Sequence, residues 1–384
     1  MNFTLVQSEL YRCLQLVSGV VPTRTSQPNL SSVRIEATAD GQLSLTGTDL
    51  DTFLVTYARA SVEEPGVVTV PARRLLEIVK ELPTEVVQIK STASGISLSC
   101  AAGKFRMMGP DPDEFPSAPE ISEDRVFAVE ADTLDSLIRK TGYAVSTDNT
   151  RAEMTGVYTH VLNGELRFVA TDGHRLARAS HRGDYPNWGD IIIPPKALSM
   201  LQRLLPDAQE SVSLSTNKRY CLFNLGSCRL YTRLLDGHFP PYEDVIARCQ
   251  PDKKIRADRE QLLACIRRVA VFSETHNRLI QLSLESGTIR VSVQTQNVGE
   301  AEDTIPSDYQ GQPFHVGFNA TYLLELLRTI ETEEIFLQFQ TPTSAGIITP
   351  AVEEGEPELL CLVMPLRLPG ADAMTEESRV SART

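Results

Sequence analysis

The chain has 384 residues, 41% hydrophobic and 23% charged, which is ordinary for a globular protein. At roughly 100–200 residues per domain, this length predicts two to four domains. No apolar run reaches the roughly 18 residues of a membrane-spanning helix, and the N-terminus lacks a secretory signal pattern. The seven cysteines form no Cys-x-x-Cys pair, so we expect neither a disulfide framework nor a metal site. We therefore expect the protein to reside in a reducing cytoplasm.

The charge balance is acidic. Lys and Arg total 37 against 50 for Asp and Glu, which gives a formal net charge of −13. A nucleic-acid binder usually shows the opposite bias. Net charge is only a sum, however, so the position of the basic residues matters more than their number.

Two markers repeat along the chain at the same spacing of 123 residues. The first is a glycine that opens an alternating apolar stretch, with copies at Gly41, Gly164 and Gly287. The second is a helical pattern, bounded by prolines in its copies over 71–83 and 194–206, with a third copy over 316–330. A period of domain length predicts tandem domains rather than a solenoid. We expect three domains, over residues 1–122, 123–250 and 251–368. A disordered tail is expected over 369–384.

Within each repeat the pattern predicts a strand, a helix and three strands, twice over, so the fold class is α+β with six β-α-β-β-β halves. In chain order, helices are expected near residues 7–19, 72–82, 133–145, 195–205, 259–271 and 320–330. The dipeptides Asp40-Gly41, Asn163-Gly164 and Ser286-Gly287 predict hairpin turns of the primed type.

The six predicted helices carry a summed charge of +6, which leaves −19 for the rest of the chain. Amphipathic helices normally expose basic residues to solvent, and that is the plain interpretation. The alternative is that all six helices face one phosphate-bearing surface, where contacts would be sequence-independent and salt-sensitive.

No phosphate-binding P-loop, nucleophile elbow or zinc-protease motif is present. The most enzyme-like stretch is 171–176, where Asp172 and His174 lie two residues apart. Asp49 holds the same repeat position without a histidine. An aspartate that recurs after a hairpin strand is more often a turn or capping residue. Hydrolysis by Asp172 and His174 stays open only as a remote alternative.

The stretch Thr171–Leu176, together with the repeats, resembles the bacterial DNA polymerase III beta subunit, the sliding-clamp family. The resemblance covers residues 1–368 in nearly constant register. Its further matching stretches are 45–50, 70–73, 236–240, 317–319 and 363–368. The chain departs from it at Glu243-Asp244, where family members often carry basic residues.

The resemblance implies a non-catalytic, head-to-tail homodimeric ring around duplex DNA, with no cofactor, metal or membrane partner. It implies that the ring tethers the DNA polymerase III alpha subunit and is loaded by a clamp loader. It also implies a cleft between the second and third domains. There the polymerase and other replication and repair proteins would insert a short peptide with apolar anchors.

The resemblance assigns three groups of residues. The expected peptide cleft comprises Met154, Thr171, Gly173, His174, Arg175, Leu176, Pro240, Val245, Tyr322, Leu362, Val363, Met364, Pro365 and Leu366. The expected DNA contacts are Arg24, Arg73 and Lys196, and the expected dimer contacts are Phe105, Met107 and Phe272. Read without the resemblance, 362–366 is an ordinary buried strand ended by proline, and Phe105 and Met107 fill the core of the first domain.

Geometry adds one constraint from size. A domain of this length approximates a sphere about 35 Å across. Three such spheres in a ring leave a hole of about 5 Å and six leave about 35 Å, whereas a B-form duplex is roughly 20 Å wide. A ring around DNA would therefore need two chains. A protein-interaction scaffold that never meets DNA is the rival interpretation, favoured by the acidic charge.

Overall fold

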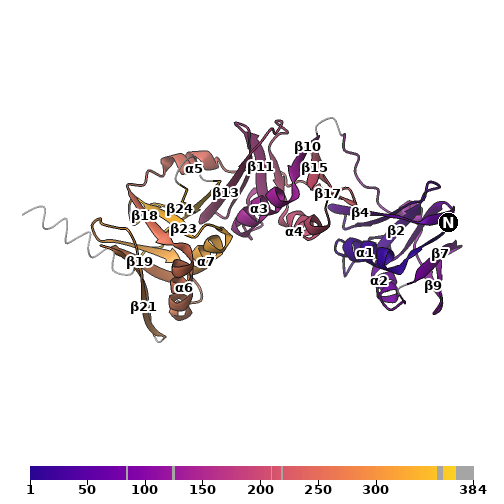
Figure 1. Ribbon diagram of the computed structural model, residues 1–384, viewed down its shortest axis with the longest axis horizontal. Coiled ribbons are helices and arrows are strands. Elements are labelled where there is room, and N and C mark those ends of the chain that lie inside the picture. Colours follow the sequence, from indigo (N-terminus) through magenta and orange to yellow (C-terminus); the bar gives the residue numbers. More distant parts are fainter. Residues whose placement is uncertain are drawn as a thin grey trace, which may run out of the picture. The chain divides into compact units, whose positions relative to one another are not determined.

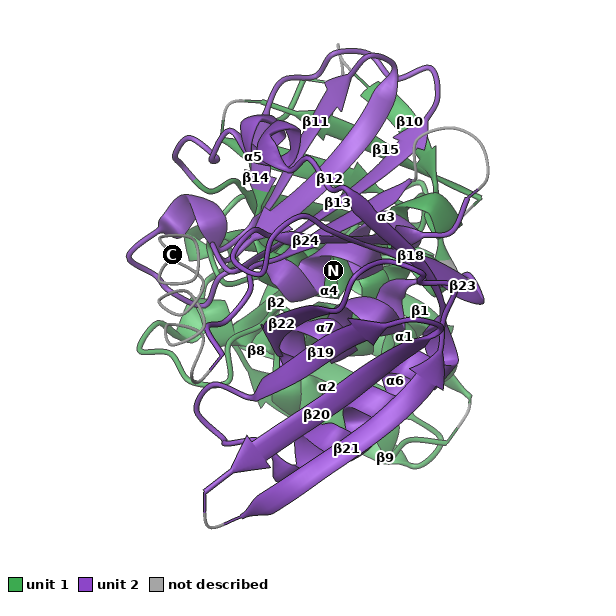
Figure 2. Cartoon of the chain, turned by 90° about the vertical axis from the view of Figure 1, so that its left-hand side faces the viewer, with its two compact units in different colours: residues 1–135, 193–235 green, residues 136–192, 236–384 purple. Residues whose placement is uncertain are grey.

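The computed structural model describes residues 1–83, 85–122, 126–208, 210–217, 219–296, 298–352 and 358–368 (Figure 1). The predicted disordered tail, 369–384, lies outside the described residues. The chain forms two compact units, one of residues 1–135 and 193–235 and the other of 136–192 and 236–384 (Figure 2). No described helix has the length and apolar character needed to cross a membrane.

The first repeat follows the predicted order with one additional strand, β5. Its first half runs through β1 (Asn2–Val6), α1 (Gln7–Ser18), β2 (Ser32–Ala37), β3 (Gln42–Thr48) and β4 (Thr52–Arg59). After β5 (Ser61–Glu64), its second half runs through β6 (Gly66–Pro71), α2 (Ala72–Lys80), β7 (Val86–Thr92), β8 (Gly95–Cys100) and β9 (Gly103–Met108).

The second repeat has the two halves without an additional strand. They consist of β10 (Val126–Glu130), α3 (Ala131–Thr141), β11 (Val157–Leu162), β12 (Glu165–Thr171) and β13 (Arg175–Arg182), then β14 (Ile191–Ile193), α4 (Pro195–Leu204), β15 (Ser211–Thr216), β16 (Tyr220–Asn224) and β17 (Cys228–Arg233). A short helix that the sequence analysis missed, α5 (Tyr242–Arg248), follows.

The third repeat has the same order. It consists of β18 (Lys253–Asp258), α6 (Arg259–Val269), β19 (Leu279–Glu285), β20 (Thr288–Thr295) and β21 (Gly299–Pro306), then β22 (Phe314–Asn319), α7 (Ala320–Thr329), β23 (Glu334–Phe339), β24 (Gly346–Pro350) and β25 (Leu359–Val363). The α+β class, the six halves and all six predicted helices are therefore confirmed.

Strands from different repeats join into continuous sheets. In one unit β4 pairs antiparallel with β17, which completes the eight-stranded sheet β10-β15-β16-β17-β4-β3-β2-β6. In the other unit β13 pairs antiparallel with β25, which completes the sheet β14-β11-β12-β13-β25-β24-β23-β18. Two smaller sheets, β5-β1-β7-β8-β9 and β21-β20-β19-β22, end in the edge strands β9 and β21.

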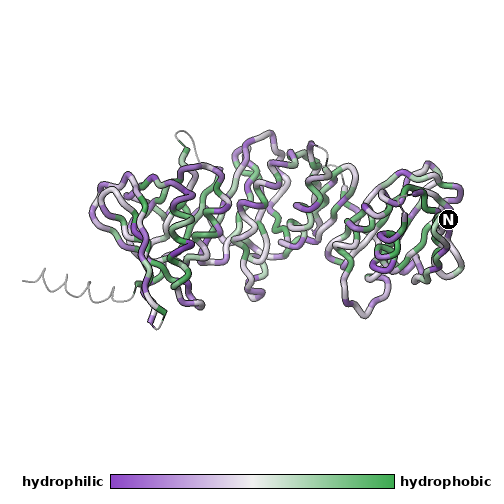
Figure 3. Tube along the Cα trace, turned by 60° about the horizontal axis from the view of Figure 1, so that its bottom comes forward, coloured by the Kyte–Doolittle hydropathy of each residue, from purple (hydrophilic) through white to green (hydrophobic). Residues whose placement is uncertain are grey.

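The core follows the period of each element. Every second residue of a central strand is buried, as at Val33, Ile35 and Ala37 of β2, because side chains alternate between the faces of a sheet. In the first repeat these side chains pack with Leu10 and Leu14 of α1 in one cluster. Figure 3 shows hydrophobic and polar residues interleaved along the trace in this way.

The three predicted hairpin turns differ in detail. Asn163 and Gly164 both have positive φ, 53° and 75°, as a primed turn requires. At the other two turns only the glycine does, Gly41 at 85° and Gly287 at 78°. The primed-type prediction is therefore wrong for those two turns.

The joint between β4 and β17 offers a test of the fold. Leu54 and Leu230 face each other across it and are fully buried. We expect Leu230→Ala to lower the free energy of unfolding by about 2–5 kcal/mol, because truncation leaves a cavity between two repeats. Urea unfolding measures this, with Val86→Ala, at a side chain 58% exposed, as the control. A loss equal to that of the control would contradict the role of the joint.

Candidate functional site

The turn before β13 is built by Asp172 and Thr171. Asp172 Oδ1 accepts hydrogen bonds from the backbone N–H groups of His174 and Arg175, both at 2.9 Å. The Thr171 hydroxyl accepts from Gly173 N at 3.1 Å and donates to Arg175 O at 2.6 Å. The carboxylate is therefore used to close a turn, as predicted, rather than to activate His174 as a hydrolase would need.

The segment after β25 lies directly against this turn. Met364 N donates to His174 O at 2.8 Å, and Leu366 N donates to Gly317 O at 2.8 Å. Leu176 and Leu362 face each other across β13 and β25. The structure thus brings together two predicted segments that lie almost 190 residues apart in the sequence.

An apolar cluster continues from this pair under α5. Leu176 and Leu362 pack with Val169, Tyr242 and Ile347. Two predicted cleft residues beside this cluster remain accessible: Val245 on α5 is 42% exposed, and Met364 is 44% exposed. Exposed apolar side chains over a buried apolar floor are typical of a docking site.

Arg175 connects several polar groups next to this apolar cluster. Its guanidinium donates to Glu325, to Asp172 Oδ2 at 3.1 Å and to Tyr143 O at 2.7 Å, and it lies 4.4 Å from the ring centroid of Tyr322. Burial disfavours its charge, but the hydrogen bond and the attraction to Glu325 outweigh burial and raise the pKa of Arg175 above its ordinary value. The group that was expected to face a peptide is therefore fully engaged inside the protein.

The remaining predicted cleft residues divide by burial. Met154 is 4% exposed, and Leu362 and Val363, at the end of strand β25, are 3% and 0% exposed. Pro240, Pro365 and Leu366 are half-buried, whereas Gly173 and His174 are exposed. The accessible surface is thus made by fewer residues than the sequence analysis assigned.

The helix α5 is held by polar contacts that the sequence analysis missed. Glu243 accepts from Arg167 Nη1 at 2.7 Å, and the Tyr242 hydroxyl lies 2.9 Å from His160 Nε2. Burial lowers the pKa of His160, which favours its neutral form. Glu243, noted above as a departure from the family, therefore anchors the helix that carries Val245.

The predicted DNA contacts all lie at the surface of one unit. Arg24 is exposed in a loop, and Arg73 is exposed on α2. Lys196, at the start of α4, forms an ion pair with Asp49. Arg24 and Arg73 therefore present their charge more fully than Lys196, whose charge is partly compensated.

The predicted dimer contacts are partly internal. Met107 is 8% exposed and lies in the core of the first repeat, and half-buried Phe105 packs against that core. Phe272, at 37% exposure, is accessible. The most exposed apolar side chains near these positions are Met108 at 75% and Val271 at 73%, and the sequence analysis had selected neither.

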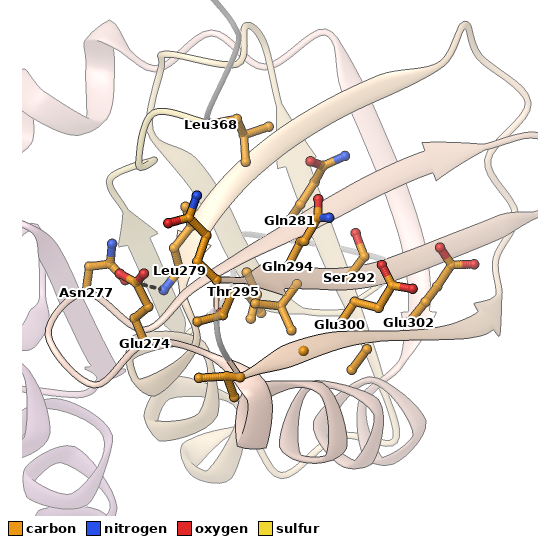
Figure 4. A pocket seen from close by; sticks show the side chains of 16 residues that line it. Glu274, Asn277, Leu279, Gln281, Ser292, Gln294, Thr295, Glu300, Glu302 and Leu368 are labelled. Carbon is orange, nitrogen blue, oxygen red and sulfur yellow. Dashed lines mark hydrogen bonds between the residues drawn. The ribbon is translucent and has the colours of Figure 1, made fainter.

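A hollow of about 1500 Å³ lies elsewhere, along β19, β20 and β21 of the third repeat (Figure 4). Its labelled side chains are mainly polar and acidic, including Gln281, Gln294, Glu300 and Glu302. It contains none of the predicted cleft residues. Among the described residues, no group of His, Cys, Asp or Glu side chains could hold a metal ion.

Three family models match the chain, all described as domains of the DNA polymerase III beta subunit. The N-terminal domain matches residues 1–119, the central domain 128–241 and the C-terminal domain 249–367. The beta sliding clamps of Synechococcus elongatus and Pseudomonas putida are 34% and 33% identical to the chain, covering 96% of it and 100% of each relative.

Solved structures give the same result. A Pseudomonas aeruginosa sliding clamp bound to griselimycin superposes with a TM-score of 0.90 at 33% identity, covering 96% of this chain and 100% of that one. The DNA polymerase sliding clamp of Bacillus subtilis superposes with a TM-score of 0.89 at 30% identity, covering 96% and 99%.

The contacts of Arg175 predict that this residue stabilises the fold. We expect Arg175→Met to lower the free energy of unfolding by about 3 kcal/mol, because it leaves Asp172 and Glu325 without their buried partner. Arg182→Met is the control, since Arg182 is 82% exposed in its ion pair with Glu165 and such pairs contribute about 0–1 kcal/mol. Equal losses of unfolding free energy for the two variants, measured with urea, would show that the contacts of Arg175 do not stabilise the fold more than a surface ion pair does.

Proposed function

This chain belongs to the family of the DNA polymerase III beta subunit, the beta sliding clamps, and we propose that two copies of it close into a ring around duplex DNA. The chain is a non-catalytic processivity factor, so it converts no substrate. We propose three domains with the boundaries 1–122, 123–250 and 251–368. None of the seven cysteines, all of which lie in the described part of the chain, forms a disulfide bond, which supports a cytoplasmic location.

One observation supports the proposed ring: the strand pairing between repeats follows a regular pattern, and two strand edges that fit this pattern have no partner within the chain. In each existing joint, the last strand of a repeat's first half pairs with the last strand of the next repeat's second half: β4 with β17, and β13 with β25. The third pair in this series is β21 with β9, and both end their sheets. A second copy supplies the missing strand at each end, which removes every open edge of this kind.

Charge complementarity supports that pairing. The edge strand β9 carries Lys104 and Arg106, and β21 carries Glu300 and Glu302. All four side chains are exposed and alternate with inward-facing residues, so they lie on the solvent face of their strands. Opposite charges on paired strands stabilise the pair and discriminate against like-charged partners.

Duplex DNA is the proposed content of the ring. Exposed Arg24 and Arg73 would make weak phosphate contacts that read no base and therefore permit sliding. The acidic remainder of the chain would repel DNA elsewhere, which makes encirclement rather than affinity the source of processivity.

The region around Val245, Met364, Leu176 and Leu362 is the proposed docking site for a partner peptide with apolar anchors. Exposed Val245 and Met364 would flank the anchors above the buried pair. The proposed partners are the alpha subunit of the polymerase, the clamp loader and other replication and repair proteins that carry such a peptide. Methionine suits such a site, because its flexible side chain adapts to different anchors.

A charge exchange tests the ring. The first variant carries Lys104→Glu with Arg106→Glu, and the second carries Glu300→Lys with Glu302→Lys. Each variant alone would oppose like charges at its joints, so we expect monomers of 42.4 kDa by light scattering at micromolar concentration. Mixed together, the variants restore opposite charges at both joints, so we expect a species of twice that mass.

The native chain provides the reference mass, and salt provides a second control, since high ionic strength should weaken the repulsion within each variant. A mixture that stays monomeric while native chains dimerise would contradict the proposed pairing of β9 with β21.

Dissociation from DNA tests encirclement. After loading onto nicked circular DNA, we expect slow release, and fast release once the circle is linearised, because a ring slides off ends. Arg24→Glu with Arg73→Glu should reduce loading by about tenfold or more at low salt. The matched control is Arg59→Glu with Lys90→Glu, an equal charge change on exposed strand residues. Equal release from circles and linear DNA would refute encirclement, and unaffected loading would favour a scaffold that never meets DNA.

A further inference from the structure

Two arginines lie on one face of the β12–β13 hairpin, and they differ in whether their side chains have acidic partners. Arg167 and Arg178 are 6% and 8% exposed. Arg167 is paired with Glu165 at 2.9 Å and with Glu243 at 2.7 Å. The side chain of Arg178 makes no hydrogen bond or ion pair with any residue that the structure describes, and its Nε atom is completely buried without an acceptor.

Arg178 lies beside the apolar cluster that forms the floor of the proposed docking site. On β13 it points to the same face as Leu176, two residues earlier, because side chains alternate along a strand. Its cross-strand neighbours are Val169 on β12 and Leu360 on β25. Both belong to or pack against the apolar cluster that contains Leu362.

Tyr242 of α5 is also close to Arg178. Burial raises the pKa of the Tyr242 hydroxyl, while the positive charges of Arg167 and Arg178 act in the opposite direction. The buried Nε–H group is costly, because it loses water and gains no acceptor in exchange. The same loss makes it a strong partner for any anion that reaches it.

We propose that Arg178 binds a carboxylate of the docked partner peptide, next to the peptide's apolar anchors. This inference rests on the proposed peptide site and adds the chemistry that the site would select. A carboxylate matches the guanidinium of Arg178 in charge and geometry. A phosphate dianion would need a second free cation, and the adjacent Arg167 is already neutralised by two carboxylates.

Three fluorescein-labelled peptides built on the sequence Gly-Ser-Leu-Ala-Leu-Phe test the proposal by fluorescence anisotropy. The first has a free C-terminal carboxylate, the second is amidated, and the third is amidated with an aspartate added after the phenylalanine. We expect the native full-length chain to bind at least one carboxylate-bearing peptide about tenfold more tightly than the amide. The first and third peptides distinguish a C-terminal from a side-chain source.

Arg178→Met is expected to abolish that tenfold preference while leaving the affinity for the amidated peptide unchanged. It is also expected to raise the melting temperature, since it removes an unpaired buried charge. The matched control is Arg167→Met, at equal burial on the same face, which should lower the melting temperature because it leaves Glu165 without its buried partner.

The outcomes separate the two proposals. If the native chain binds all three peptides equally, or if Arg178→Met weakens all three alike, Arg178 binds no peptide carboxylate and the peptide site itself stands. If the native chain binds none of the peptides, the docking site fails and the assignment of Arg178 fails with it. A fall in melting temperature for Arg178→Met would show that the guanidinium serves the fold instead.

Discussion

Antiparallel pairing between strand edges of different repeats is the constraint that organises this protein. A single repeat ends each of its sheets in a strand whose backbone N–H and C=O groups have no partner, and such edges attract other chains. The joints β4–β17 and β13–β25 resolve this inside the chain and produce two eight-stranded sheets. The strands β9 and β21 end their sheets without such a partner, and these are the edges at which we propose that a second copy pairs.

The second joint also creates the candidate docking site. Because β13 pairs with β25, the turn 171–176 meets the segment 362–366, and Leu176 and Leu362 lie in one apolar cluster. The linker between the second and third repeats then folds into α5 over the same sheet, held through Glu243 and Tyr242. One hydrogen-bonded joint therefore both completes the sheet and brings together the residues of the candidate docking site.

The polar groups around that joint have different roles, although their types are alike. Arg175 and Arg167 are enclosed by carboxylates and hold the turn and α5 in place. Arg178, on the same strand as Arg175, has no such enclosure among the described residues. The difference follows from the sheet, since alternation and register decide which of these side chains meets an acidic neighbour.

Most of the architecture is encoded locally and was predictable. The constant spacing predicted three tandem repeats, and the apolar periods predicted six halves and six helices, because period and turn chemistry depend on neighbouring residues. The capping role of Asp172 was also predictable from its recurrence as Asp49. The short helix α5 was missed, because seven residues after two prolines carry too little periodicity to detect.

Side-chain partners were decided only by the tertiary structure. Nothing within a few residues of Glu243 indicates Arg167, and nothing near Met107 shows that it is buried while Met108 is exposed. These outcomes depend on strand register and on contacts between segments up to about 190 residues apart, which no local pattern specifies. The sequence alone thus determined what the repeats are, and the pairing of their edges decided which residues form a site.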